Sequence, residues 1–256
     1  MLVSEVMLQQ TQTSRVIAPW RRFLEACPTP TACADQPLSS ILQLWEGLGY
    51  HRRAKALHEA ARVIVRDFDG QVPRDAVALR RLPGVGEYTA NAVASFAFDL
   101  PLAVLDTNVG RVLARAVANR QLGGRDARIM AQELLPNSDV SSFNQSMLDL
   151  GAQFCRSAPL CGACPVATVC RWQREGGDDP APKSAGVSRP QSLFAGSNRQ
   201  VRGRVLAMLR TGTTSNAKLE KTLADVDGSR LAVILAGLID DGLIERRGRS
   251  LRLAGG

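Results

Sequence analysis

LPGVGEYTA, residues 82–90, interrupts a long helical pattern that runs from residue 75 to residue 98. Proline cannot continue a helix and glycine commonly ends one, so this stretch predicts two helices joined by a tight turn at Pro83–Gly86. Amphipathic helices separated by short turns continue on both sides, over residues 1–175. The sequence shows neither strands alternating with helices nor an internal repeat. We therefore expect an all-α fold built around this turn.

The composition agrees with a helical globular protein. Alanine, leucine and arginine dominate and aromatic residues make up only 5% of the chain, which favours helices over sheets. A length of 256 residues suffices for one sizeable core and a small satellite domain. No apolar run approaches the roughly 18 residues that span a membrane, and the N-terminus lacks a basic region followed by a cleavage site. We expect a cytoplasmic protein.

The net charge of +8 comes almost wholly from arginine, since the chain has few lysines. A basic protein suits a polyanionic partner, because neutralising phosphates releases counterions and supplies affinity whatever the sequence. Many arginine-rich chains bind no nucleic acid, so charge alone does not decide the function.

The turn at Pro83–Gly86 gives a local reason to expect nucleic acid. Glycine lets another backbone come close, and the turn leaves the first amides of the next helix free for a phosphate. The same residues also fit a plain turn between packed helices. The alanine-rich helix that follows favours a helix–hairpin–helix DNA clamp. We assign DNA contact to four of its residues: Leu82, Gly84, Gly86 and Thr89.

Four cysteines fall within 16 residues: Cys155, Cys161, Cys164 and Cys170. The cytosol keeps thiols reduced, so we interpret them as ligands of one metal centre, with buried structural cysteines as the alternative. Zinc usually takes two CxxC-type pairs, often with histidine. Here a single CxxC has one cysteine on each side, and His51 and His58 lie far upstream, which favours an iron–sulfur cluster. Cys27 and Cys33 are expected to be ordinary buried thiols.

The stretch VLDTNVGRVLAR, residues 104–115, places Asp106 between a short apolar run and a helix. Aspartate is favoured there because its carboxylate accepts hydrogen bonds from the first amides of the helix. An N-cap is therefore the direct interpretation. A capping aspartate is also ionised and fixed in place, so with Thr107 and Asn108 alongside it can stabilise a cationic intermediate.

We divide the chain into a helical core (residues 1–150), a cysteine loop (151–175), a linker (176–192) and a small domain (193–256). The linker is rich in Gly, Pro, Asp and Ser. The small domain has helical stretches followed by two short strands around Arg247–Gly248, a pattern typical of a winged helix. A packing domain with an arginine-rich surface fits the same pattern.

Five motifs in the same order resemble the helix–hairpin–helix DNA glycosylase superfamily and, within it, the adenine DNA glycosylases of the MutY type. They are SEVMLQQTQ (residues 4–12), LWEGLGY (44–50), LPGVGEYTA (82–90), LDTNVGRVLAR (105–115) and FNQSMLDLGAQFC (143–155). The resemblance covers residues 2–175. It implies a base excision repair hydrolase that releases adenine mispaired with 8-oxoguanine or guanine. It also implies a nucleoid-associated monomer that binds double-stranded DNA and carries a 4Fe–4S cluster on the four cysteines.

The resemblance also gives roles to individual residues. Glu5 matches the glutamate that protonates the flipped adenine at N7 and helps to activate water. Asp106 matches the aspartate that stabilises the oxocarbenium-like sugar, with Asn108 beside it. These roles follow the two-carboxylate chemistry of glycosidases. Gln9 and Tyr50 match residues that wedge into the DNA at the lesion, and the resemblance places Gln10 next to the base pair.

Tyr88 separates the subfamilies. Relatives resembling endonuclease III carry a lysine at this position, whose amine attacks the sugar and leads to strand cleavage. This chain has tyrosine there and no lysine between Lys55 and Lys183. We expect a monofunctional enzyme that releases the base and leaves an abasic site, with Tyr88 among its catalytic residues.

The chain departs from the family in three places. Its first two cysteines are closer together than usual, and it lacks the pattern of the Nudix-like domain with which many relatives inspect 8-oxoguanine. Relatives also carry a further segment before SEVMLQQTQ, so we expect Glu5 to lie without its usual N-terminal support. Two alternative functions stay open: a thymine or uracil mismatch DNA glycosylase, and a non-catalytic iron–sulfur DNA-binding protein. The LQQTQ segment argues against the first of them.

Overall fold

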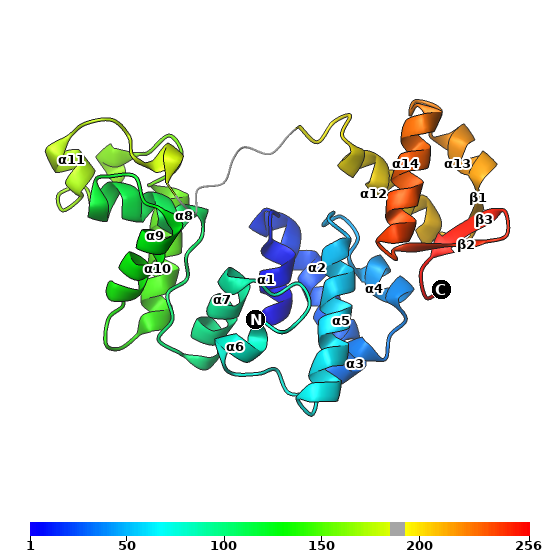
Figure 1. Ribbon diagram of the computed structural model, residues 1–256, viewed down its shortest axis with the longest axis horizontal. Coiled ribbons are helices and arrows are strands. Elements are labelled where there is room, and N and C mark those ends of the chain that lie inside the picture. The colour runs from blue at the N-terminus through cyan, green and yellow to red at the C-terminus, as the bar shows by residue number, and fades with distance from the viewer. Residues whose placement is uncertain (185–192) are drawn as a thin grey trace. The chain divides into compact units, whose positions relative to one another are not determined.

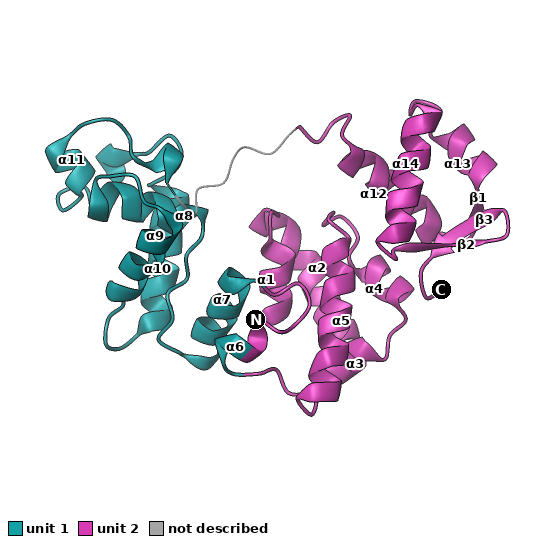
Figure 2. Cartoon of the chain, in the orientation of Figure 1, with its two compact units in different colours: residues 1, 74–77, 86–190 teal, residues 2–73, 78–85, 191–256 magenta. Residues whose placement is uncertain are grey.

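A computed structural model describes residues 1–184 and 193–256 of the chain (Figure 1). The chain forms two compact units (Figure 2). Unit 1 comprises residues 1, 74–77 and 86–190, and unit 2 comprises residues 2–73, 78–85 and 191–256. In the part of the chain described, no helix is both long and apolar enough to cross a membrane.

The N-terminal part of unit 2 is a helical bundle centred on α5. Its helices are α1 (Leu2–Leu8), α2 (Thr13–Ala26), α3 (Pro30–Ala34), α4 (Leu38–Leu44) and α5 (Arg52–Asp67). Helix α5 packs against α1, α3 and α4, and α1 also packs against α2. In the core the rings of Phe23 and Trp45 meet edge to face, with centroids 6.5 Å apart. Burial of such large side chains supplies most of the stability of a bundle of short helices.

The C-terminal part of unit 2 combines three helices with a small sheet. Its elements are α12 (Asn198–Arg210), β1 (Thr214–Ser215), α13 (Asn216–Thr222), α14 (Gly228–Asp240), β2 (Ile244–Arg247) and β3 (Ser250–Leu253). The sheet is antiparallel with strand order β1-β3-β2. The β2–β3 turn needs the left-handed backbone of Gly248, at φ 59°. Strand β3 packs against α12 and against α4 of the helical bundle.

Unit 1 contains the remaining helices. They are α7 (Glu87–Phe98), α8 (Thr107–Val112), η1 (Leu113–Ala118), α9 (Gly124–Glu133), α10 (Val140–Gln153), η2 (Cys161–Ala163), α11 (Arg171–Glu175) and η3 (Ala181–Lys183), while the short α6 (Ala76–Leu79) lies at the boundary between the units. Helix α8 runs directly into the π-helical turn η1. Leu113, which is fully buried, belongs to the core that α8, η1 and α9 share.

Part of the predicted linker belongs to unit 1 and packs against the rest of it. Ala181 is buried, and the Ser184 hydroxyl accepts a hydrogen bond from the Leu122 amide at 3.1 Å. Asp179 pairs with a buried arginine of η1, Arg115, at 2.6 Å. Residues 185–192 of the linker lie outside the described residues. The linker and the other domain boundaries stay predictions.

Candidate active site

Helix α1 carries the glutamate that the sequence singles out. Glu5 lies in the first turn of α1 and is 8% exposed. The helix ends at Leu8, and Gln9 and Gln10 form the turn that follows, with Gln10 in the left-handed region at φ 56°. The Gln9 amide nitrogen lies 3.5 Å from the carbonyl oxygen of Gly84. Unit 2 therefore places a buried carboxyl group and a glutamine that reaches the hairpin on one short segment.

Arg53 of α5 holds this segment in place, and the sequence interpretation missed it. Its guanidinium lies over the ring of Trp45 and over the ring of Tyr50, 5.5 and 5.3 Å from their centroids. Burial lowers the pKa of Arg53 to about 10, still well above neutrality. The guanidinium donates hydrogen bonds of 2.5–3.3 Å to the carbonyls of Val6, Met7, Gln9, Leu48 and Gly49 and to the hydroxyl of Thr11.

Tyr50 stands at the end of the loop that precedes α5. Its backbone is left-handed at φ 46°, directly after Gly49 at φ 66°. A bulky residue rarely adopts this conformation, so the surrounding contacts must impose it. The hydrogen bonds of Arg53 to Leu48 and Gly49 supply that constraint. The wedge role of Tyr50 stays a prediction.

The hairpin has the glycine geometry that the sequence predicts. Gly84 has φ 76°, and a Cβ atom there would lie 2.7 Å from the Cβ of Ala56 in α5. Gly86 is the N-cap of α7 and leaves the first amides of that helix without a side-chain cap. Leu82 and Thr89 are both buried. DNA contact at these two positions would therefore involve their backbone rather than their side chains.

Asp106 is the N-cap of α8, as the sequence predicts. Its Oδ1 accepts hydrogen bonds from the amides of Asn108 and Val109, both at 2.8 Å, and its Oδ2 accepts one from the Asn108 side chain at 2.9 Å. Burial raises the pKa of Asp106, and these hydrogen bonds act in the opposite direction. Three donors thus fix the carboxylate in one orientation.

A chain of hydrogen bonds connects Asp106 with the first cysteine of the loop. The carbonyl of the Asn108 side chain accepts from Arg111 at 2.7 Å, and Arg111 also donates to the carbonyl of Cys155 at 2.7 Å. Helix α10 approaches Asn108 at Gly151, where a Cβ atom would lie 2.6 Å from the Asn108 Cβ. The glycine of LDLGAQF is therefore required by the contact between α8 and α10.

Tyr88 lies in the first turn of α7 and lines a cavity of about 620 Å³ in unit 1. Asn91 and Leu105, the residue before Asp106, line the same cavity. Asn91 donates to the carbonyl of Ala103 at 3.0 Å, which ties the segment before Asp106 to α7. Arg128 of α9 also lines the cavity and pairs with Glu87, another lining residue, at 3.7 Å.

All six cysteines have free thiols. Cys27 and Cys33 are buried, as predicted. The other four belong to the segment between α10 and α11, where Cys170 is buried and the rest are half-buried. Burial raises the pKa of the Cys155 and Cys161 thiols. Among the described residues, no group of three or more histidine, cysteine, aspartate or glutamate side chains is arranged to hold a metal ion.

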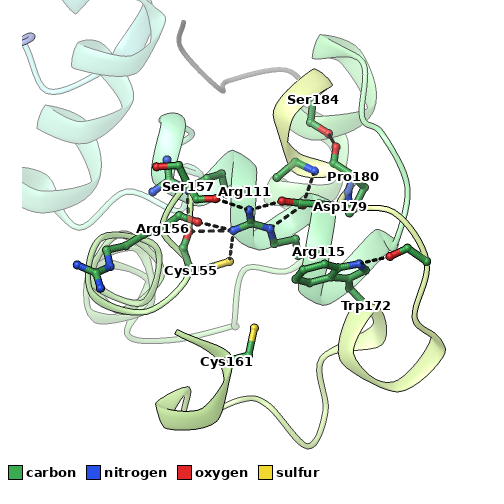
Figure 3. A network of polar contacts seen from close by, with 12 residues as sticks. Arg111, Arg115, Cys155, Arg156, Ser157, Cys161, Trp172, Asp179, Pro180 and Ser184 are labelled. Carbon is green, nitrogen blue, oxygen red and sulfur yellow. Dashed lines mark hydrogen bonds and ion pairs between the residues drawn. The ribbon is translucent and has the colours of Figure 1, made fainter. Parts of the chain in front are cut away.

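Arg115 of η1 organises the cysteine loop (Figure 3). It is 1% exposed, pairs with Asp179 at 2.6 Å and lies 5.5 Å from the ring centroid of Trp172. One guanidinium nitrogen lies 3.5 Å from the Cys155 sulfur, and the Cys170 sulfur lies 3.8 Å from the Arg115 carbonyl. Arg115 also donates to the carbonyls of Arg156 and Ser157. The first and last cysteines of the loop therefore contact the same residue.

The hairpin, the aspartate that caps α8 and the helical core define a helix–hairpin–helix base excision repair fold. A family model described as HhH-GPD superfamily base excision DNA repair protein matches residues 3–136. The chain belongs to this family. The family resemblance predicted from the five motifs is confirmed, and so is the helix–hairpin–helix fold of the core.

Several individual proteins are similar to this chain. The chain is 42% identical over 251 residues to an adenine DNA glycosylase of Mycolicibacterium smegmatis, and the alignment covers 96% of this chain and 83% of that relative. Among solved structures, it is similar to a thermostable thymine-DNA glycosylase, with a TM-score of 0.61 and 30% identity, over 68% of this chain and 83% of that one. A trapped covalent intermediate of endonuclease III with DNA has a TM-score of 0.62 and 29% identity, with the same coverage.

Proposed function

We propose that this protein is an adenine DNA glycosylase that hydrolyses the N-glycosidic bond of adenine mispaired with 8-oxoguanine or guanine. The observation that carries the proposal is the identity to an adenine DNA glycosylase over nearly the whole chain. The fixed carboxylate of Asp106 supports it from the chemical side, because an anion held beside C1′ stabilises the developing sugar cation.

In the proposed reaction Glu5 acts as the acid. Its carboxyl proton goes to N7 of adenine, the C1′–N9 bond breaks, and the bonding electrons leave with the base. Asp106 stabilises the sugar cation, and Asn108 keeps its carboxylate oriented. Water then adds to C1′ and gives its proton to the Glu5 carboxylate, which restores the acid. Tyr88 has no amine to attack C1′, so the product is an abasic site in an intact strand.

The DNA-binding residues of the proposal fall on three segments: the turn after α1, the loop before α5 and the hairpin. Gln9, Gln10 and Tyr50 would act at the lesion, where an extruded base leaves a gap in the stack. The hairpin would hold the backbone through the amides that follow Gly84 and Gly86. The contact between Gln9 and Gly84 supports a common role for the turn after α1 and the hairpin.

The four cysteines of the loop are proposed to bind a 4Fe–4S cluster. Their donor set fits, because all are free thiols and in such a cluster each cysteine binds an iron of its own. Zinc ligands, in contrast, must converge on a single ion. When bound, the cluster would cross-link the loop between Cys155 and Cys170. A purified protein with broad visible absorption and bound iron supports this assignment, whereas a colourless protein with one zinc per chain contradicts it.

A thymine mismatch DNA glycosylase is the second candidate, because a thymine-DNA glycosylase is among the similar structures. The test uses duplexes with adenine opposite 8-oxoguanine, adenine opposite guanine, or thymine opposite guanine, each treated with and without alkali. Alkali-dependent breaks at adenine, absent in Glu5→Gln and Asp106→Asn, are expected. Breaks only at thymine would move the assignment to the second candidate, and breaks without alkali would contradict a monofunctional enzyme.

A further inference from the structure

The proposed chemistry uses none of the arginines that line a second cavity, in unit 2. This cavity of about 460 Å³ lies between the segments 10–15 and 46–51 of the helical bundle and helix α12 of the C-terminal part. Three arginines line it, Arg15, Arg199 and Arg210, and we call it the arginine pocket. Glu46 is the one acidic side chain among its described lining residues. Three positive charges against one negative charge leave the pocket with a net charge of about +2 at neutral pH.

Aromatic rings orient the guanidinium of Arg199. It lies 5.3 Å from the ring centroid of Tyr50 and 5.4 Å from that of Phe194, and it donates a hydrogen bond to the Tyr50 hydroxyl. A guanidinium packed against rings keeps its N–H groups in its own plane, where the oxygens of a planar or tetrahedral anion can accept them. Arg199 therefore reaches the pocket with its orientation already fixed.

Arg210 makes polar contacts with the loop before α5. Its side chain is 12% exposed, and it donates to Glu46 and to the ring nitrogen of His51, each at 3.2 Å. Within the described part of the chain, its buried Nε has no hydrogen-bond partner. Burial, together with the charges of Arg210, Arg202 and Arg53, lowers the pKa of His51 to about 4. His51 is thus neutral at physiological pH and leaves the positive charge of the pocket unchanged.

The C-terminal part is joined firmly to the bundle around this pocket. Asp241 at the end of α14 is 7% exposed in its side chain and pairs with Arg52 of α5 and Arg202 of α12. Its carbonyl also accepts a hydrogen bond from Lys55 at 2.8 Å. These contacts join α12 to α5 through a carboxylate that is largely removed from water, so the two walls of the pocket are held together without a ligand.

We propose that the arginine pocket binds a phosphodiester group of DNA through Arg15, Arg199 and Arg210. The inference rests on the proposed function only in taking DNA as the anion, since three arginines around one pocket suit any phosphate group. Residues 193–256, which the sequence predicts to form a winged helix, would then extend the DNA-binding surface beyond the hairpin. A protein phosphate site of this kind adds affinity that does not depend on the DNA sequence.

Salt dependence of binding tests the proposal in the full-length protein. Fluorescence anisotropy with a labelled, fully paired duplex gives the dissociation constant at several salt concentrations. The affinity K falls as salt rises, and the steepness of log K against log salt decreases by about 0.9 for each phosphate contact that is lost. We expect Arg199→Ala to reduce the slope by about this amount and to weaken binding about 3- to 10-fold at low salt. Arg15→Ala should have a similar effect.

Two matched variants keep the test decisive. Arg204→Ala removes an arginine from the same helix whose partner is Asp225 and which does not line the pocket, so its slope should equal that of the unchanged protein. Arg199→Lys keeps the charge and loses the planar fork, so most of the slope should remain. Unchanged slopes for both Arg199→Ala and Arg15→Ala would overturn the proposal. A slope in Arg199→Lys as low as in Arg199→Ala would overturn the charge argument.

Two further comparisons identify the ligand and separate the proposals. Inorganic phosphate that displaces DNA equally well from the Arg199→Ala variant and the unchanged protein would contradict a phosphate pocket at this place. If the protein does not excise adenine but the slopes change as expected, the proposed function is wrong and the proposed DNA site stands. If the protein excises adenine normally but the slopes do not change, the proposed DNA site is wrong and the proposed function stands.

Discussion

Replacing Gly151 by alanine tests whether the contact between α10 and α8 positions the candidate catalytic carboxylate. The new Cβ would lie 2.6 Å from both the Cβ and the carbonyl oxygen of Asn108. Ordinary contacts are about 1 Å longer, so one of the two helices must move. Because Asn108 holds Asp106 through its amide and its side chain, movement of α8 displaces the carboxylate.

The expected loss of activity exceeds the loss of stability. Overpacking of this kind costs about 1–3 kcal/mol, which lowers the melting temperature of a protein of this size by about 2–4 °C for each kcal/mol. A misplacement of about 1 Å at a reacting group lowers the rate about 100-fold. Thermal unfolding and single-turnover excision of adenine from an adenine–8-oxoguanine duplex measure the two quantities on one preparation.

Gly228→Ala provides the control. Gly228 begins α14, has an ordinary backbone conformation, and has no neighbouring atom within 4 Å of the place that a Cβ atom would take. The substitution should leave both stability and rate unchanged. Excision by Gly151→Ala at the rate of the unchanged protein, with an unchanged melting temperature, would refute the reasoning that this glycine positions Asp106.

Three further predictions concern buried charges. Arg53→Ala leaves several buried carbonyls without a donor and should lower the free energy of unfolding, measured in urea, by about 3 kcal/mol. Arg115→Ala leaves Asp179 without its partner and should cost about 3–5 kcal/mol, whereas Glu175→Ala at the exposed pair on α11 should leave unfolding unchanged. Burial raises the pKa of Asp106 in the folded protein above its value in the unfolded chain. The contribution of this group to the free energy of unfolding is therefore fully present below the unfolded pKa and is lost as pH rises through the folded pKa. Asp106→Asn should therefore gain stability relative to the unchanged protein between acid and neutral pH, and the acid limb of the excision rate should lie above the pKa of an exposed aspartate, about 3.9. Equal pH profiles of stability for the two proteins would contradict this.

Local rules account for the parts that the sequence predicted. The Asp106 cap, the glycine conformation of the hairpin and the helices around them depend on residues within a few positions of one another, where capping and turn preferences act. The β2–β3 turn at Gly248 belongs to the same class. Each of these features follows from chain geometry that a short window of sequence contains.

The contacts that the sequence did not predict join distant residues. Arg53 looks like one of several arginines on the polar side of α5, and only its neighbours in space distinguish it. Arg115 and Asp179 lie 64 positions apart, with Asp179 in a segment whose composition is typical of a linker. Arg199 and Tyr50 are 149 positions apart. Side-chain pairing of this kind depends on the fold, so a pattern of residue types cannot specify it.

The position of Arg53 also affects how the protein opens and folds. One guanidinium supplies hydrogen bonds both to the end of α1 and to the loop at Leu48 and Gly49, two segments about 40 residues apart in the chain. Neither segment can leave its place without breaking bonds that the other shares. They should therefore open as one cooperative unit, and the amides of Thr11 and Leu48 should exchange their hydrogens at similar rates.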